Sequence, residues 1–400
     1  MADTSHSPAQ AFDVIVIGAG LAGLAAALGL ARAGLRCACV GRLERSGPGR
    51  TVALLGRSLD ILEGLGVMAE IEAKAAPMRA MRLVDDTGSL FAPRPVNFRA
   101  SEIGRDVFGW NIENGALSSI LAEALGDLPR FETDVVGFDF GADAVRLTLS
   151  DGRALSAALV IGADGRGSPS RKASGIDATT RNFGQTALTL ALRHTRPHDD
   201  ASTEFHTREG PFTLVPLPPT AEAPHRSSLV WLMRDATAER MTRLSDRELA
   251  AQLRARSHAM LGEIEIEGGR GGFPMTVQRV ARLTGRRLAL VGDAAHAFPP
   301  IGAQGLNLGL RDVAEIVTQA ARARDEGQDP GGEATLEAYA AARRPDIALR
   351  TTAVGALNLS LLAPYLPVDA ARGLGLAALA AVTPLRRLAI REGLTPFLAR

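Results

Sequence analysis

The chain has 400 residues, of which 46% are hydrophobic and 22% are charged, and its formal net charge is +1. This composition is typical of a globular protein with a large core in two or three lobes, and the near-zero charge excludes a chain-wide attraction to nucleic acid or to an anionic membrane. No apolar run is as long as a membrane span, and the N-terminus lacks the regions of a signal peptide. Cys37 and Cys39 lie on one face of a strand-like run and cannot pair with each other, so we expect reduced thiols and a cytoplasmic protein.

The first predicted element is a β-α-β unit. A strand over Phe12–Ile17 leads into an Ala-rich helix that ends at Gly34, and a second strand spans residues 35–40. The turn between the first strand and the helix is Gly18, Ala19, Gly20, Leu21, Ala22 and Gly23. Its first glycine permits the tight turn, the second lets the backbone approach a pyrophosphate, and the third lets the helix pack closely on the strand. In this context the motif predicts a dinucleotide site, and the alternative is a glycine-rich turn without a ligand.

One part of this fingerprint is missing. The acid that usually binds the adenosine ribose should follow the second strand, but Gly41 and Arg42 occupy its place. Glu44 is near enough in sequence to substitute, and Arg42 would suit a 2′-phosphate. We favour FAD over NADP because of two motifs further along the chain.

Residues 50–180 contain a second, weaker site signal. We expect a helix-like segment to begin at Arg50, strands over 78–100, a helix over 111–125 and a hairpin turned by Asp151-Gly152. Arg50 is either a cofactor ligand or a solvated arginine. Asp164 stands among glycines after the apolar run 159–161, at the end of a predicted strand where α/β sheets bind ligands, although a turn or cap aspartate is an equally common role.

Residues 182–275 have the alternating pattern of a mainly antiparallel sheet. Phe212, Leu214 and Trp231 are candidates to line a substrate pocket, but each of them alone is more typical of a core residue. A helix is expected over 241–261.

The most informative stretch is 285–312, GRRLALVGDAAHAFPPIGAQGLNLGLRD. An apolar strand ends at Gly292-Asp293, and a turn that includes Pro300 leads into a helix. The acid can accept ligand hydroxyls, and the helix end offers unpaired N–H donors. The first amides of that helix come from Gly305, Leu306 and Asn307.

The remainder from Ala334 is predicted to be helical. Arg386, Arg387 and Arg391 alternate with apolar residues there, which suits either a membrane surface or a helix packed on the domain with solvated arginines. We therefore predict an α/β protein: a Rossmann-like dinucleotide domain (12–77, 101–180 and 276–345), an inserted mainly antiparallel β-sheet substrate domain (78–100 and 181–275) and a C-terminal helical segment (346–400).

The three glycine and aspartate segments, in this order, resemble the single-component FAD-dependent aromatic hydroxylases related to p-hydroxybenzoate hydroxylase. The likeness covers nearly the whole chain, and the stretches RTVALLGRSLDILEGLGV, FGQTAL and GDAAHAFPPIGAQGLNLGLRD are most similar to the ubiquinone-biosynthesis members. The resemblance implies that Gly18, Gly20 and Gly23 hold the FAD pyrophosphate and that Asp293 binds the ribityl chain. It also implies that the amides of residues 305–307 face the flavin, and that Asp164 and Arg50 lie near the cofactor.

The chain departs from this family at three places. Gly41 replaces a ribose-binding Glu, Pro299 replaces a histidine, and Gly302-Ala303 inverts the usual order. These departures leave the adenosine contact and any proton transfer at residue 299 open.

The resemblance further implies the chemistry. NADH or NADPH would reduce FAD, O2 would form a flavin C4a-hydroperoxide, and a hydroxyl would pass to an aromatic ring, here a polyprenylated phenol of ubiquinone biosynthesis. The flavin carries the chemistry, so we expect no metal site and name no catalytic side chain. We expect no nucleic-acid partner, and a cytoplasmic protein either free or peripheral at the inner membrane or in a biosynthetic complex. The alternatives are a hydroxylase of a small soluble aromatic and a non-catalytic flavin-binding accessory protein.

Overall fold

The computed structural model describes residues 9–43, 49–88, 94–297, 304–362 and 366–394. Two eight-stranded sheets and a three-stranded sheet make up its β-structure. The first large sheet contains β17 (Thr284–Gly285), β18 (Leu288–Leu290), β11 (Ala154–Gly162), β1 (Gln10–Ile17), β2 (Cys37–Val40) and β8 (Arg130–Phe131) in that order. Off this path, β10 (Val145–Leu149) pairs with β11, and β9 (Val135–Phe140) pairs with β10.

The centre of the first sheet is parallel, as the β-α-β pattern predicts. β1 pairs in parallel with β2 on one side and with β11 on the other. Val14, Ile15 and Val16 are fully buried because helices cover the sheet. The helices of this part are α1 (Leu21–Arg32), α2 (Arg57–Gly64), α3 (Met68–Lys74), α4 (Asn114–Ala124), α5 (Pro169–Ala173) and α8 (Gln304–Asp325). The predicted hairpin is confirmed: β10 pairs antiparallel with β11, and Gly152 in its turn has a φ of 87°.

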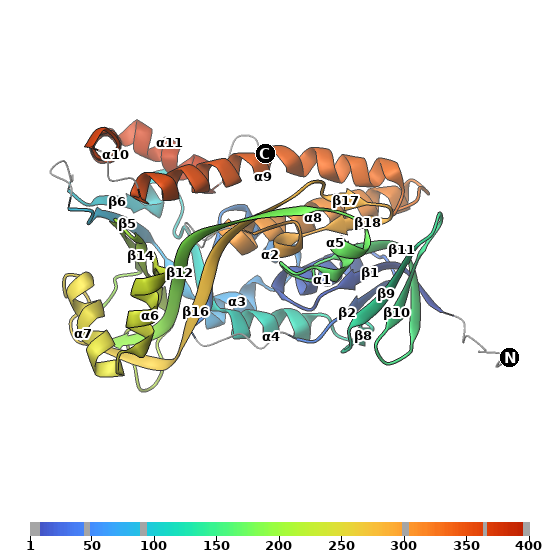
Figure 1. The fold of residues 1–400 in the computed structure, drawn as a ribbon, viewed down its shortest axis with the longest axis horizontal. Coiled ribbons are helices and arrows are strands. Elements are labelled where there is room, and N and C mark those ends of the chain that lie inside the picture. The colour runs from blue at the N-terminus through green and yellow to red at the C-terminus, as the bar shows by residue number, and fades with distance from the viewer. Residues whose placement is uncertain (1–8, 44–48, 89–93, 298–303, 363–365, 395–400) are drawn as a thin grey trace.

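The second large sheet is mainly antiparallel, as predicted. Its strand order is β19 (His296–Ala297), β16 (Ile264–Val280), β12 (Ala178–His194), β15 (Arg226–Arg234), β14 (Gly210–Leu217), β13 (Ala201–Thr207), β5 (Ala80–Asp85) and β6 (Val96–Arg99). One pair, β13 with β5, is parallel. β12 and β16 are each 17 residues long and run side by side from this sheet toward the first one (Figure 1).

Two predicted helices are partly strands. Residues 51–55 form β3 (Thr51–Leu55), which pairs antiparallel with β7 (Gly109–Glu113), and β4 (Ala76–Met78) completes the three-stranded sheet. Helix α2 begins after Gly56, whose φ of 55° ends the strand. The helix prediction was therefore wrong over residues 50–55 and 111–113, because strand pairing between distant segments outweighs local helical spacing there, and it is confirmed over Arg57–Gly64.

The predicted helix over 241–261 is divided. Residues 235–256 form α6 (Asp235–Arg243) and α7 (Asp246–Arg256). The break lies at Ser245, which starts α7 through a capping box with Glu248: its hydroxyl accepts from the Glu248 N–H at 3.3 Å. Both helices pack on one face of the second sheet.

The C-terminal part is helical, as predicted. It comprises α9 (Glu333–Leu362), α10 (Leu366–Ala381) and α11 (Thr383–Leu394), and the short 3-10 helices elsewhere are η1 (Ala100–Ile103) and η2 (Gly292–Ala294). Helix α9 runs along one side of the molecule, past both large sheets (Figure 1). Helix α11 packs on the domain through buried Ile390, and Arg386 donates to Glu102 at 2.7 Å.

Candidate functional site

Three strand ends lie side by side at one edge of the first sheet. The register pairs Ile17 of β1 with Gly162 of β11, and Gly162 with Leu290 of β18. Two further hydrogen bonds continue past the strands: Ala163 N–H donates to the Ile17 carbonyl at 2.8 Å, and Val291 N–H donates to the Gly162 carbonyl at 3.0 Å. The glycine turn, the Asp164 segment and the Gly292-Asp293 segment therefore form a single site, although 275 sequence positions separate Gly18 from Asp293.

The glycine turn is shaped for close backbone approach. Gly18 has a φ of 110°, and a Cβ there would lie 2.3 Å from the Ala163 carbonyl oxygen. A Cβ on Gly23 would lie 1.9 Å from the Gly18 carbonyl oxygen. Helix α1 begins at Leu21 with Gly20 as its N-cap, and within the described part of the chain no side chain caps its first amides. These amides, with Ala22 in the first turn, face the strand ends and suit a pyrophosphate.

The backbone conformation at Gly41 accounts for the absence of a ribose-binding acid at this position. Its φ is 148°, and a Cβ there would lie 2.9 Å from the backbone nitrogen of Ala19 in the glycine turn. A side chain at this position would press on the turn itself. Arg42 pairs with Asp134 at 3.2 Å, and both side chains are exposed. Glu44 lies outside the described residues.

Asp164 has a capping role in the structure. Its carboxylate accepts hydrogen bonds from the Ser168 hydroxyl at 2.5 Å and from the Ser170 N–H at 2.8 Å. It thereby orders the start of α5. Arg171 on that helix donates to the Ala294 carbonyl at 2.9 Å, so the Asp164 segment and η2 are held together.

Asp293 presents its carboxylate at the sheet edge. Its side chain is 48% exposed and forms an ion pair with Arg166 at 3.3 Å. Gly292 before it has a φ of 57°, which turns the chain out of β18. An exposed carboxylate beside the two other strand ends is suited to accept hydrogen bonds from ligand hydroxyls.

The N-terminus of α8 is fastened to β3 by one side chain. The Asn307 Nδ2 donates to the Ala53 carbonyl at 2.7 Å, and its Oδ1 accepts from the Leu55 N–H at 3.0 Å. The carboxamide therefore has a structural role. The backbone amides of Gly305 and Leu306 lie in the first turn, where N–H groups have no partner within the helix.

A buried charge network lies behind this site, and the sequence analysis did not predict it. Asp312 is fully buried, and one of its oxygens accepts from the Gly292 N–H at 3.1 Å and contacts His296 Nε2 at 2.6 Å. The other oxygen accepts from Arg343 Nε at 2.8 Å. Arg343 and Arg311 both pair with buried Asp346, at 2.9 and 3.0 Å. Helix spacing places Arg343 and Asp346 on one face of α9, which is the only local signal of this network.

Burial and charge act in opposite directions on this network. Burial alone would raise the pKa of Asp312, but the charges of His296 and Arg343 and their hydrogen bonds lower it below its ordinary value. Burial lowers the pKa of Arg311 to about 10 even though Asp346 opposes the shift. Since Asp312 also binds Gly292 N–H, the network fixes the backbone that carries Asp293.

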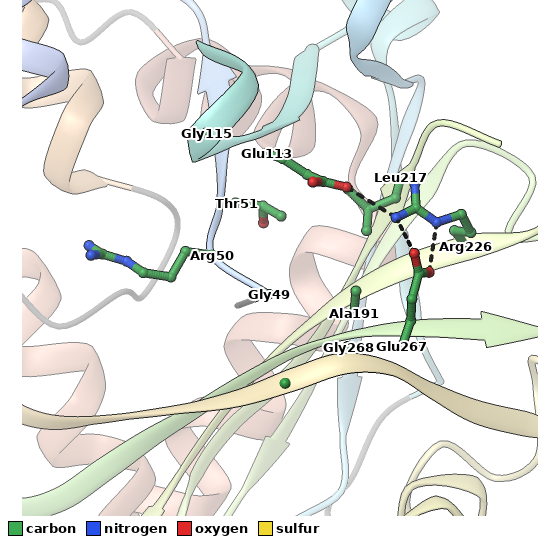
Figure 2. Close-up of a pocket in the computed structure, with 11 residues that line it drawn as sticks. Gly49, Arg50, Thr51, Glu113, Gly115, Ala191, Leu217, Arg226, Glu267 and Gly268 are labelled. Carbon is green, nitrogen blue, oxygen red and sulfur yellow. Dashed lines mark hydrogen bonds and ion pairs between the residues drawn. The ribbon is translucent and has the colours of Figure 1, made fainter. Parts of the chain in front are cut away.

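A pocket of about 280 Å³ lies between the three-stranded sheet and the second large sheet (Figure 2). Arg226 is 7% exposed and donates through Nε and Nη2 to the two oxygens of Glu267, both at 2.8 Å. It also donates to Glu113 at 3.1 Å. Burial alone would lower the pKa of Arg226, but its hydrogen bonds to the two glutamates raise it. Arg50 lines the pocket too, with its guanidinium carbon 5.1 Å from the Phe273 ring centroid.

The candidate substrate-lining residues lie on the wrong face of the sheet for this pocket. Phe212 pairs directly with Trp231 across β14 and β15, and both belong to the core against α6 and α7, together with Leu214. Side chains alternate between the two faces of a strand, so the pocket is lined by the neighbouring positions, such as Ala191 and Leu217. The alternative expectation, that the three residues are core, holds. Pro300, like Pro299 and Gly302-Ala303, lies outside the described residues.

The fold and the strand-end site together define the class of protein. Residues 11–352 match the FAD binding domain family, which is most of the chain, so this protein belongs to that family of FAD-dependent hydroxylases. Within the described residues the ligands needed for a metal site do not come together.

Curated relatives extend over nearly the full length. The chain is 33% identical over 392 residues to "Ubiquinone hydroxylase UbiL" of Rhodospirillum rubrum, which covers 96% of this chain and 89% of that protein. It is 28% identical over 397 residues to "3-demethoxyubiquinol 3-hydroxylase" of Escherichia coli, covering 96% and 99%.

Solved structures show the same fold. p-Nitrophenol 4-monooxygenase PnpA of Pseudomonas putida superposes with a TM-score of 0.77 at 19% identity, covering 96% of this chain and 98% of that one. A variant of HpxO from Klebsiella pneumoniae, solved in complex with FAD, gives a TM-score of 0.76 at 20% identity with the same coverage.

Proposed function

We propose that this protein uses NADH or NADPH and O2 to hydroxylate the ring of a polyprenylated phenol in ubiquinone biosynthesis. The observation that carries the proposal is that the glycine turn and Asp293 meet at one sheet edge, in a chain whose curated relatives are named ubiquinone hydroxylases. The first half of α8 packs against the same edge, since a Cβ on Gly309 would lie 3.2 Å from the Gly292 Cα. Bound FAD would supply the redox chemistry, accepting a hydride from the nicotinamide and activating O2.

Each part of the site would have a distinct task. The α1 amides at Gly20, Leu21 and Ala22 would bind the pyrophosphate, and Asp293 would accept hydrogen bonds from the ribityl hydroxyls. Reduced flavin is an anion, and the first amides of α8, from residues 305–307, would stabilise its negative charge through the helix dipole and free N–H groups. The second sheet would cover the ring and exclude water.

The C-terminal helices support a peripheral contact with the membrane that holds a prenylated substrate. Seven large hydrophobic side chains are exposed in the described part of the chain, and four of them lie on α10 and α11 or between them. These are Leu374, Val382, Leu385 and Leu388. Arg387 and Arg391 are exposed beside them and would face anionic headgroups. No single helix among the described residues is long and apolar enough to cross a bilayer, whereas Gly373–Ala381 and Thr383–Arg391 meet those criteria together as a pair bent by 106°.

The substrate is tested by mass analysis of quinone intermediates in cells that lack the protein. We expect a prenylated phenol without the new hydroxyl to accumulate and ubiquinone to fall. Normal ubiquinone with no accumulated phenol contradicts the proposal and favours a small soluble aromatic substrate instead.

The membrane contact is tested by co-sedimentation with vesicles of phosphatidylcholine and phosphatidylglycerol. The double variant Leu374→Glu/Leu388→Glu should lose binding. The matched control is Val136→Glu, because Val136 is 63% exposed on β9 in the other part of the molecule. Equal sedimentation of all three proteins contradicts a contact through this surface.

A further inference from the structure

The pocket at Glu113 lies close to the end of α8 that faces the flavin in the proposed function. Asn307 binds Ala53 and Leu55 of β3, and Thr51 of the same strand lines the pocket. Thr51 is two residues before Ala53, a distance of about 7 Å along a strand. One strand, β3, therefore both lines the pocket and holds the N-terminal turn of α8.

The buried cation of this pocket is already neutralised. Three of the five N–H groups of Arg226 are directed to Glu267 and Glu113, and a fourth donates to the Pro218 carbonyl at 2.9 Å. Arg226 is also 7% exposed. A ligand carboxylate that approached Arg226 would have to displace Glu267 from a bidentate pair, which is among the strongest hydrogen-bond geometries in proteins.

The group that faces a ligand is instead a carboxylate. The Glu113 side chain is 49% exposed, and its Oε1 accepts from Arg226. Its other oxygen lies away from Arg226, on the side of Thr51 (Figure 2). The Arg50 side chain points away from Glu113 in the same view, and its guanidinium lies over Phe273. The charged group that faces a ligand beside Thr51 is therefore the Glu113 carboxylate.

We propose that Glu113 is the specificity residue of this pocket: it accepts a hydrogen bond from a hydroxyl of an uncharged phenol and rejects a ring that carries a carboxylate. Arg226 and Glu267 are positioning residues that hold Glu113 in place. A hydroxyl group donates to a carboxylate without a change of charge, whereas a ligand carboxylate would meet a like charge beside an arginine that is already neutralised. This inference rests on the proposed function and specifies its substrate as a neutral phenol.

The test compares two ligands that differ by one carboxylate, 2-allylphenol and 3-allyl-4-hydroxybenzoate. Binding to the FAD-loaded protein is measured by the change in flavin absorbance. Wild type should bind 2-allylphenol more tightly by about tenfold or more, as expected for rejection of a like charge. The discrimination ratio is the dissociation constant of 3-allyl-4-hydroxybenzoate divided by that of 2-allylphenol. Glu113→Gln should reduce this ratio by about tenfold, because the amide has no charge and can donate to a carboxylate. Glu113→Asp, which keeps the charge, should retain most of the discrimination.

The matched control is Glu263→Gln, which removes an exposed glutamate that pairs with Arg254 at 3.1 Å, away from the pocket. Its ratio should equal that of wild type.

An unchanged ratio in Glu113→Gln with full FAD content overturns the inference, even if the protein hydroxylates phenols. A ratio that falls in Glu113→Gln supports it. Absence of NAD(P)H oxidation with every phenol, while the ratio still depends on Glu113, contradicts the proposed function and not the ligand preference. If Glu113→Gln does not fold, two other variants test the inference. Loss of the preference for 2-allylphenol in Glu267→Gln, with its retention in Glu113→Asp, supports the inference, whereas an unchanged preference in both variants overturns it.

Discussion

The Asp312 carboxylate lies 2.6 Å from Nε2 of His296, and both residues are buried behind the strand-end site. The same oxygen accepts from the Gly292 N–H, one residue before Asp293. Arg343 of α9 balances the charge on the other oxygen at 2.8 Å. The interior of the helical layer is therefore connected by hydrogen bonds to the loop that presents Asp293.

Replacement of Asp312 by Asn should destabilise the protein by about 3–5 kcal/mol, because the buried charges of Arg343 and Arg311 must then share the single carboxylate of Asp346. The free energy of unfolding from urea titration measures this. The control is Glu326→Gln, which removes an exposed i,i+4 pair with Arg322 at the end of α8 and should cause no measurable change. Equal stability of Asp312→Asn and wild type contradicts a role for the network in holding α8 and α9 together.

The same carboxylate makes stability depend on acid pH. The pKa of Asp312 is lowered in the folded protein, so its contribution is fully present above the ordinary value of 3.8 and is lost as pH falls below it. Wild type should therefore lose stability in that range more steeply than Asp312→Asn, which has no carboxyl to protonate. Parallel acid unfolding curves of the two proteins contradict this.

Asp293→Ala should lose bound flavin rather than only slow turnover, because the carboxylate would accept hydrogen bonds from the ribityl hydroxyls. FAD content after desalting, read from the yellow absorbance, is the measurement. Asp151→Ala is the control, since Asp151 is also an exposed aspartate paired with an arginine, Arg153, but lies in the β10–β11 hairpin. Full yellow colour in Asp293→Ala removes this residue from the proposed binding site.

Gly41→Glu should weaken FAD binding even though it restores the acid found in related proteins. The reason is the backbone: at a φ of 148° any Cβ lies 2.9 Å from Ala19 N. Strain of this kind is about 1–3 kcal/mol, which corresponds to a loss of about 5- to 150-fold in affinity. Gly41→Ala should show the same loss, because the Cβ causes it. Tighter FAD binding by Gly41→Glu contradicts the argument.

Cys37 and Cys39 should not react with a thiol reagent in the native protein. Both side chains are buried, and burial raises the pKa of Cys39 to about 12 and that of Cys37 further, so the reactive thiolate is disfavoured. We expect labelling of both thiols only after unfolding in guanidinium chloride, as counted by mass spectrometry. Rapid native labelling would show that the sheet opens around β2.

The sequence by itself determined the features that depend on neighbouring residues. The glycine turn after β1, the hairpin at Gly152 and the Gly292-Asp293 turn are local patterns, because each is set by backbone conformations that only a few residue types adopt. The resemblance that these segments carry also predicted the FAD-dependent hydroxylase family, which the match over 11–352 confirms.

Only the tertiary structure decided what depends on distant pairing. Thr51–Leu55 is a strand because it pairs with Gly109–Glu113, and no local pattern specifies that partner. The faces of β14 and β15 are set by where α6 and α7 pack, which places Phe212 in the core rather than in the pocket. Glu113, Arg226 and Glu267 come together from three separate segments, and a charge balance of this kind exists only once the two sheets meet.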